Sequence, residues 1–196
     1  MEVREPDMTY NSYTYADYLQ WNIDEVFEII KGKVFKMNAA PRLKHQRISW
    51  RISSKLANFL EGKSCEGFYA PFDVRLPVNS KKNEDIYTVV QPDICVVCDK
   101  SKLDEAGCIG APDLIIEILS KGNNKKELKY KYEVYEESGV KEYWIIHPDE
   151  ETLLVYTLVN NKYQASKLFT SGDVITTTIL PDFELDLEMI FAELES

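Results

Sequence analysis

The sequence predicts an α/β (α+β) protein in which strands and helices are mixed around one sheet. Two observations support this class. Short apolar runs bounded by turn residues alternate with segments whose apolar residues recur at helical spacing, and neither type is confined to one part of the chain. The chain has 196 residues, of which 44% are hydrophobic, and is expected to form one domain over residues 1–196.

The first elements follow from capping and turn signals. Residues 14–21 predict a short helix with Thr14 as its N-cap, and residues 27–37 predict a hairpin that turns at Lys31–Gly32. An amphipathic helix is expected after Pro41 and should end near Gly62. Its apolar residues recur at helical spacing: Ile48, Ile52, Leu56, Phe59 and Leu60.

The middle of the chain predicts a strand over 68–77, a polar loop over 79–85, and two apolar strands over 92–98 and 112–119. Asn124 and Glu127 resemble a capping box.

The helix that this capping box starts should run to Ser138, with Gly139 just beyond it. Strands over 142–147 and 152–156 should follow, and a helix over 185–194 should close the fold.

Acidic residues lie inside the two apolar strands, where an uncompensated carboxylate is costly. If the strands pair antiparallel across their connection, the numbers of paired residues sum to about 210, so Asp93 lies opposite Glu117 with Cβ atoms about 5 Å apart. Two carboxylates this close favour a cation between them, and their oxygen ligands suit Mg²⁺ or Mn²⁺. Asp113 is about 13 Å away along its strand and is interpreted as a strand-start residue.

Helical phase distinguishes Lys131 from its neighbours. With Leu128 as the reference, Lys131 falls between Val134 and Tyr135 on the apolar side, whereas Lys126 and Lys129 fall on the outer side. A lysine near two carboxylates could stabilise charge on a phosphate or help to activate water. The alternative is that Lys131 extends to the rim of the helix.

Other polar residues carry weaker signals. Glu28 lies in the first hairpin. By itself, an acid at such a position is more often an edge-strand residue that prevents aggregation than a ligand. His45 shares the apolar face of the helix after Pro41 and is interpreted as a core residue, and Asp73 is ambiguous. That helix also has a basic side, which consists of Arg42, Lys44, Arg47 and Arg51. These residues could contact phosphate or simply be solvated.

Composition limits the partners and the compartment. The net charge is −10, so any contact with nucleic acid needs a local basic patch or a metal. Residues 1–7 are charged and lack the apolar stretch of a signal peptide, which predicts a cytoplasmic location. The four cysteines suggest no disulfide framework; Cys95 and Cys98 should point to opposite strand faces as small buried residues.

Several segments together resemble the Uma2 family, also called DUF820, within the PD-(D/E)XK nuclease superfamily. The resemblance covers nearly the whole chain and is carried by the order and spacing of these segments: 27–32, 45–48, 73–76, Pro92-Asp93, 110–120, Lys131 with Tyr135, and 139–144.

The resemblance implies a restriction-endonuclease-like fold, in which a central mixed β-sheet is flanked by helices and the metal site lies at one edge of the sheet. It matches Asp93 to the aspartate of the PD element, Glu117 to the acid of the next strand, and Glu28 to an N-terminal acid that completes the site. Leu119 stands where the superfamily lysine is usual, and Lys131 is matched to a lysine moved to the following helix. Residues 120–123 depart from the family's usual Ser-Pro-Ser/Thr.

Three functions remain open from the sequence. The first is a Mg²⁺-dependent (or Mn²⁺-dependent) endonuclease that hydrolyses DNA through metal-activated water, with Asp93, Glu117 and Glu28 at the metal and Lys131 at the phosphate. The second is a non-catalytic module that binds nucleic acid or protein and retains the nuclease fold. The third is a hydrolase of a smaller phosphate ester. Analogy with superfamily nucleases predicts a homodimer.

Overall fold

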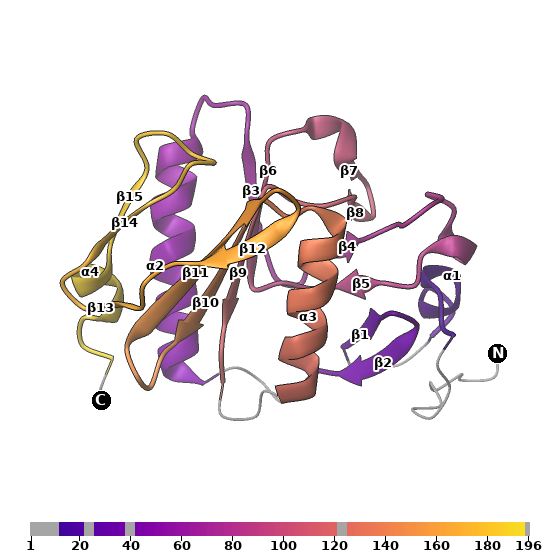
Figure 1. Cartoon of the computed structure of the whole chain (residues 1–196), viewed down its shortest axis with the longest axis horizontal. Coiled ribbons are helices and arrows are strands. Elements are labelled where there is room, and N and C mark those ends of the chain that lie inside the picture. The colour runs from indigo at the N-terminus through magenta and orange to yellow at the C-terminus, as the bar shows by residue number, and fades with distance from the viewer. Residues whose placement is uncertain (1–11, 22–25, 38–41, 121–124, 195–196) are drawn as a thin grey trace.

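The computed structural model describes residues 12–21, 26–37, 42–120 and 125–194, with the side chains of the third helix described from Leu128 onward (Figure 1). These parts contain four α-helices: α1 (Tyr15–Tyr18), α2 (Leu43–Leu60), α3 (Lys125–Ser138) and α4 (Leu187–Phe191). Two 3₁₀ turns, η1 (Asn83–Asp85) and η2 (Lys100–Lys102), lie in loops.

The central sheet has seven strands in the order β12-β11-β10-β9-β6-β3, with β13 paired to β11. It is mixed, because β9 and β10 pair in parallel and the other neighbours pair antiparallel. Its strands are β3 (Glu66–Tyr69), β6 (Ile94–Val97), β9 (Leu114–Ile118), β10 (Glu142–His147), β11 (Thr152–Val159), β12 (Lys162–Ala165) and β13 (Phe169–Thr170).

The described residues form three sheets rather than the one sheet that the sequence predicts. A six-stranded sheet in the order β2-β1-β5-β4-β8-β7 and a two-stranded sheet of β14 and β15 accompany the central one. Their strands are β1 (Phe27–Ile30), β2 (Lys33–Lys36), β4 (Val74–Arg75), β5 (Val89–Val90), β7 (Leu103–Asp104), β8 (Gly107–Ile109), β14 (Val174–Thr176) and β15 (Glu184–Asp186).

The predicted pairing of the two acid-bearing strands is confirmed. Ile94 pairs with Ile116 and Val96 with Leu114, so the paired numbers sum to 210. Alternate residues then face opposite sides. Ile94 and Val96 pack with α2, and Cys95 packs with α3. The two long helices therefore lie on opposite faces of the central sheet, which confirms the flanked arrangement (Figure 1).

The N-terminal elements also form as predicted. Thr14 caps α1, and a capping box links it to Asp17. The hairpin of β1 and β2 turns at Lys31 and Gly32, both of which have positive φ. Helix α2 ends at Leu60, two residues before Gly62, which also has positive φ.

Two predicted boundaries are wrong, and one connection contains elements that the sequence does not predict. The strand expected over 68–77 is divided between β3 and β4, which belong to different sheets, and Pro71 between them has no N–H to continue a ladder. The connection over 99–111 contains η2, β7 and β8. The closing helix is confined to Leu187–Phe191 because Glu184–Asp186 pairs with β14.

Some sequence predictions fall outside the described residues. They concern Pro41, the departure at 120–123 (beyond Ser120), and the capping residue Asn124. The side chains of Lys126 and Glu127 likewise lie outside the described part of α3.

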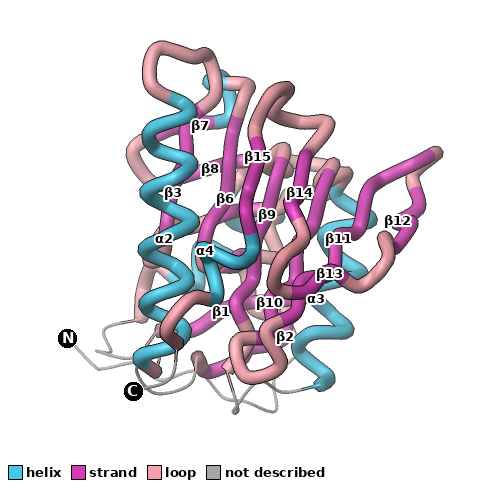
Figure 2. The backbone as a smooth tube through the Cα atoms, turned by 90° about the vertical axis from the view of Figure 1, so that its left-hand side faces the viewer, coloured by secondary structure: helices cyan, strands magenta, loops and turns pink. Residues whose placement is uncertain are grey.

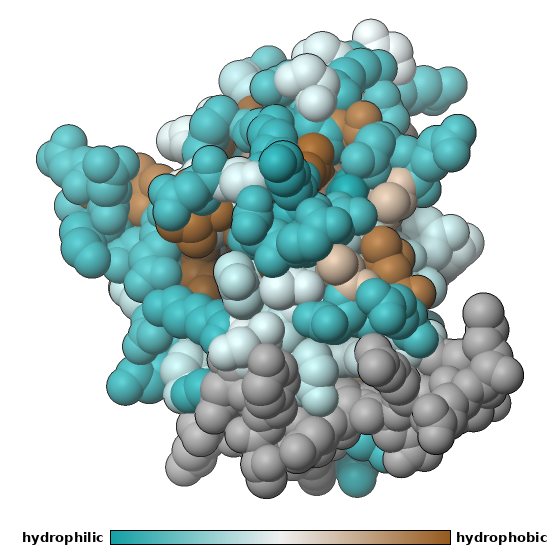
Figure 3. All heavy atoms as spheres, turned by 90° about the vertical axis from the view of Figure 1, so that its right-hand side faces the viewer, coloured by the Kyte–Doolittle hydropathy of each residue, from teal (hydrophilic) through white to brown (hydrophobic). Residues whose placement is uncertain are grey.

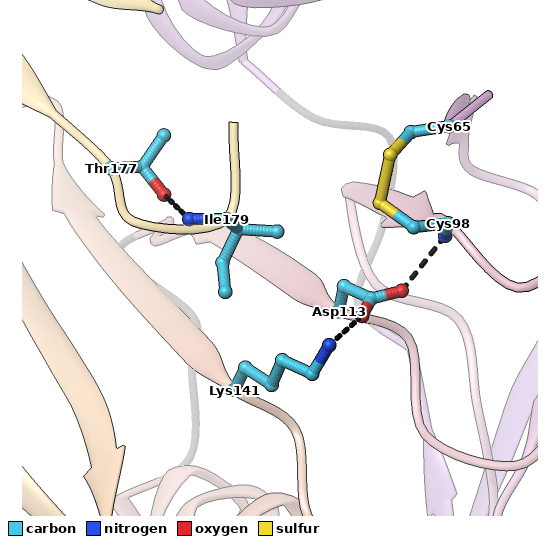
Figure 4. Close-up of a disulfide and its surroundings, with 6 residues drawn as sticks. All are labelled: Cys65, Cys98, Asp113, Lys141, Thr177 and Ile179. Carbon is cyan, nitrogen blue, oxygen red and sulfur yellow. Dashed lines mark hydrogen bonds and ion pairs between the residues drawn. A yellow bond between two sulfur atoms is a disulfide. The ribbon is translucent and has the colours of Figure 1, made fainter. Parts of the chain in front are cut away.

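Cys65 and Cys98 form a disulfide, so the expectation that Cys98 is a free buried residue is wrong (Figure 4). The pairing of Glu66 with Val97 places these cysteines opposite each other at the end of the β3–β6 ladder. The predicted opposite orientation of Cys95 and Cys98 is confirmed, because Cys95 packs on the α3 side and Cys98 on the α2 side. The sequence does not reveal the pairing, since the partner lies 33 residues away.

Reduction of this disulfide should destabilise the protein. A cross-link over 33 residues restricts the unfolded chain, and removing such a cross-link lowers the free energy of unfolding by about 2–4 kcal/mol. Urea unfolding with and without dithiothreitol measures this change. The variant Cys98→Ser should match the reduced wild type and should not respond to dithiothreitol. Equal stability of the oxidised and reduced wild type would contradict the prediction.

Neither the surface shown in Figure 3 nor the described helices have an extended apolar region. The face that carries α1 and β5 is mainly hydrophilic, with hydrophobic residues in small separate patches (Figure 3). Among the described residues, none of the helices combines the length and the apolar character that crossing a membrane requires.

Candidate active site

Glu28, Glu117 and Lys131 meet in one buried cluster between the two large sheets and α3. The Lys131 Nζ lies 2.9 Å from Glu28 Oε1 and 3.0 Å from Glu117 Oε1. The three residues come from β1, β9 and α3. Lys131 is buried, so helical phase predicted its orientation correctly and the rim alternative is wrong.

Glu28 lies in the interior of the second sheet, not at its edge. Strand β1 is flanked by β2 and β5, and the Glu28 side chain is fully buried. Its Oε1 accepts a hydrogen bond from the backbone N–H of Gln91 at 2.7 Å, whereas its Oε2 is buried with no hydrogen-bond partner. The interpretation of Glu28 as an edge-strand residue that prevents aggregation is therefore wrong. Its Oε2 can still bind a cation or accept a hydrogen bond.

Glu117 is held by α3 through two donors to the same oxygen. Its Oε1 accepts hydrogen bonds from Lys131 Nζ and from the hydroxyl of Tyr135 at 2.8 Å. Burial raises the pKa of Glu117 to about 8; the Lys131 charge opposes this rise, while the charges of Asp93 and Glu28 add to it. Burial thus favours the protonated carboxyl group, whereas the Lys131 charge and the Tyr135 hydroxyl favour the ionised one.

Asp93 lies immediately before β6, opposite Glu117 in the continued register. Its Oδ2 accepts a hydrogen bond from the N–H of Ile118 at 2.7 Å, and its Oδ1 is 3.1 Å from Nε2 of His45. The Asp93 side chain is 18% exposed, more than those of Glu28, Glu117 or Lys131, so the cluster is most accessible from this side.

Two other buried acids are fully satisfied by the protein. Both oxygens of Glu142 accept hydrogen bonds, from Trp144, Thr177 and Thr178. Asp113 bonds the N–H of Cys98 and the ammonium of Lys141, as expected for a strand-start residue (Figure 4). Neither acid leaves an oxygen for a ligand, which distinguishes both of them from Glu28.

The charge of the cluster suits a divalent cation. When all four groups are ionised, Glu28, Asp93 and Glu117 carry three negative charges against the one positive charge of Lys131, which leaves two. Among the described side chains, no group of three or more His, Cys, Asp or Glu residues is arranged to enclose a metal. Mg²⁺ does not need such a cage, because it commonly takes one or two carboxylates and keeps several waters. The donor set therefore fits Mg²⁺ bound by Asp93 and Glu117.

The structure adds residues that the sequence interpretation did not assign to the site. His45 contacts Asp93 instead of serving only as a core residue. Gln91 supports Glu28 through its backbone, and its side chain donates to Asp73 and Tyr18. The position of Gln91 directly before Pro92-Asp93 was the available sequence signal. The ambiguous Asp73 thus belongs to a polar network beside the cluster, and burial raises its pKa.

Two arginines of the proposed basic helix side have structural partners. Arg47 donates to the carbonyl of Glu193, and Arg51 donates to the carbonyls of Ile190 and Ala192. These bonds tie α2 to the end of α4, which lies beside it (Figure 2). The guanidinium groups therefore cap carbonyl groups there and are poor candidates for phosphate contacts.

The mixed sheet between two long helices, with an acid–lysine cluster between this sheet, the second sheet and α3, defines a protein of the restriction-endonuclease-like fold. A family model, Uma2, described as "Putative restriction endonuclease", matches residues 15–188. The chain belongs to the Uma2 family.

A solved structure supports the fold. The chain is similar to "a putative nuclease belonging to DUF820" from Anabaena variabilis, with a TM-score of 0.74 and 21% sequence identity over 93% of this chain and 99% of that one. At this identity the likeness establishes the fold. No curated protein matches the chain.

Proposed function

We propose that the protein is a magnesium- or manganese-dependent endonuclease that hydrolyses phosphodiester bonds of DNA. The observation that carries the proposal is the buried cluster of Glu28, Glu117 and Lys131 beside Asp93, in which three carboxyl groups face one ammonium group and one carboxylate oxygen has no partner. Membership of the Uma2 family supports a nucleic-acid substrate.

Each residue has a distinct role in this proposal. Asp93 and Glu117 hold the divalent ion, and Glu28 completes or orients the ligand set through its free Oε2. When bound, the ion supplies Lewis-acid activation of water and neutralises charge on the phosphate. Lys131 contributes a fixed positive charge to the phosphate in the transition state, while its bonds to Glu28 and Glu117 keep it in place.

A cleavage panel tests this function. The substrates are single-stranded and double-stranded DNA, the corresponding RNA, and a small phosphodiester, each with Mg²⁺, Mn²⁺ or EDTA. We expect DNA cleavage that requires the divalent ion and falls by about 10²–10³-fold or more in Glu117→Gln. The matched control is Lys129→Ala, because Lys129 lies on the exposed side of the same helix and should leave the rate unchanged.

Each alternative function has its own outcome in this panel. Cleavage of the small ester but not of nucleic acid would replace the endonuclease with a small phosphate-ester hydrolase. Metal binding without turnover of any substrate would favour the non-catalytic binding module, which the net charge of −10 also suits. Cleavage that is unchanged in Glu117→Gln would exclude this cluster as the active site.

Two further properties stay predictions. The homodimer expected from superfamily nucleases is tested by sedimentation at several protein concentrations. The cytoplasmic location is tested by fractionation, and the Cys65–Cys98 disulfide weighs against it, because such bonds persist mainly in oxidising compartments.

A further inference from the structure

His45 occupies an unusual position for a residue on the apolar face of a helix. It lies in the first turn of α2, on the face that also buries Ile48 and Ile52, and is itself only 8% exposed. Its Nε2 is 3.1 Å from Asp93 Oδ1, whereas its Nδ1 is buried and has no hydrogen-bond partner. A buried nitrogen without a partner destabilises the fold, so packing alone does not explain a histidine at this position.

Two hydrogen-bond donors, one on each carboxylate oxygen, restrain the Asp93 side chain. The strand supplies one donor, since the Ile118 N–H bonds to Oδ2, and helix α2 supplies the other, since His45 bonds to Oδ1. The contact to a carboxylate requires the proton on Nε2 of the imidazole. One carboxylate thus joins the end of β9 to the beginning of α2, and its orientation relative to Glu117 is fixed by both.

We infer that His45 is a positioning residue that orients Asp93 for the divalent ion. The inference rests on the proposed function, because it assigns Asp93 as a ligand of that ion. Carboxylates that bind metals are commonly held by further hydrogen bonds, and loss of such a bond lowers metal affinity by about 10–100-fold. His45 contacts Asp93 directly, so its effect on the ion passes through this carboxylate.

Two substitutions separate positioning from packing. His45→Leu fills the apolar face but removes the donor, and Asp93 can still be hydrated because its side chain is 18% exposed. His45→Gln retains an N–H donor near the position of Nε2. If His45 positions Asp93, the leucine variant loses metal affinity and the glutamine variant retains it, although both variants fold.

Calorimetric titration of the metal-free protein with Mn²⁺ and with Mg²⁺ measures this effect without any substrate. The dissociation constant should rise about 10–100-fold in His45→Leu and stay within about threefold of wild type in His45→Gln. Melting temperatures in EDTA should stay within about 4 °C of wild type for both variants. Asp93→Asn provides the reference for a lost ligand.

The outcomes distinguish the inference from the function on which it rests. Wild-type affinity in His45→Leu would overturn the positioning role and leave the proposed function intact. Equal loss of affinity in both variants would also overturn it, because the donor would then not be the property that matters. Absence of Mg²⁺ and Mn²⁺ binding by the wild type would overturn the proposed function together with the inference.

Discussion

Lys131→Met is expected to lower the rate of metal-dependent DNA cleavage by about 10²–10³-fold. The methionine removes the positive charge that the proposal assigns to the transition state. It also leaves the buried carboxylates of Glu28 and Glu117 without their shared ammonium, and breaking a buried ion pair lowers the free energy of unfolding by about 3–5 kcal/mol. Single-turnover cleavage and urea unfolding measure the two effects separately.

A double variant measures how much stability is lost through the unpaired carboxylate. Combining Lys131→Met with Glu28→Gln removes one buried carboxylate together with the ammonium, so part of the lost stability should return. Cleavage should stay low, because both substitutions change the proposed active site. The exposed neighbour provides the control, because Lys129→Met should change neither quantity. Cleavage that recovers along with stability in the double variant would show that Lys131 only maintains the fold.

The second large effect concerns Glu117 and pH. Because burial raises the pKa of Glu117 to about 8, the folded protein binds this proton more tightly than the unfolded chain does. In EDTA, the protonation of Glu117 contributes its full amount to the free energy of unfolding below about pH 4.5. This contribution is lost as the pH rises toward about 8. Glu117→Gln should therefore flatten the fall in stability across this window. Unfolding in urea between pH 5 and pH 9 measures the slope.

Saturating Mg²⁺ should also flatten the slope of the wild type, because a bound cation replaces the proton at the carboxylate. Glu105→Gln is the matched control: Glu105 is exposed, and the variant should retain the wild-type slope. A slope in EDTA that is the same for wild type and Glu117→Gln would contradict the raised pKa.

The parts of the site that follow from local geometry could be predicted from the sequence. Once β6 and β9 are assumed to pair antiparallel across their connection, the register follows and places Asp93 opposite Glu117. Helical phase over about two turns distinguishes Lys131 from several other lysines. Both arguments use the fixed period of a strand or a helix over a few residues, where little else can intervene.

The remaining contacts depend on how distant segments pack, which no local period reveals. The N–H of Gln91 meets Glu28 across 63 residues, and the Cys65–Cys98 bond spans 33. His45 has the apolar neighbours of a core residue, and its contact with Asp93 depends on the packing of α2 against the beginning of β6. The sequence does not predict the division into two large sheets, because the alternation over residues 68–77 resembles one strand on both sides of Pro71.

The central claim is that Asp93 and Glu117 hold a divalent cation. The most direct test is an anomalous difference map from crystals soaked in Mn²⁺, recorded for wild type and for Glu117→Gln. The account predicts a strong peak between the carboxylates of Asp93 and Glu117 in the wild type and no peak there in the variant. A wild-type map without a peak at these carboxylates, under conditions in which the crystals bind Mn²⁺ elsewhere, would contradict it.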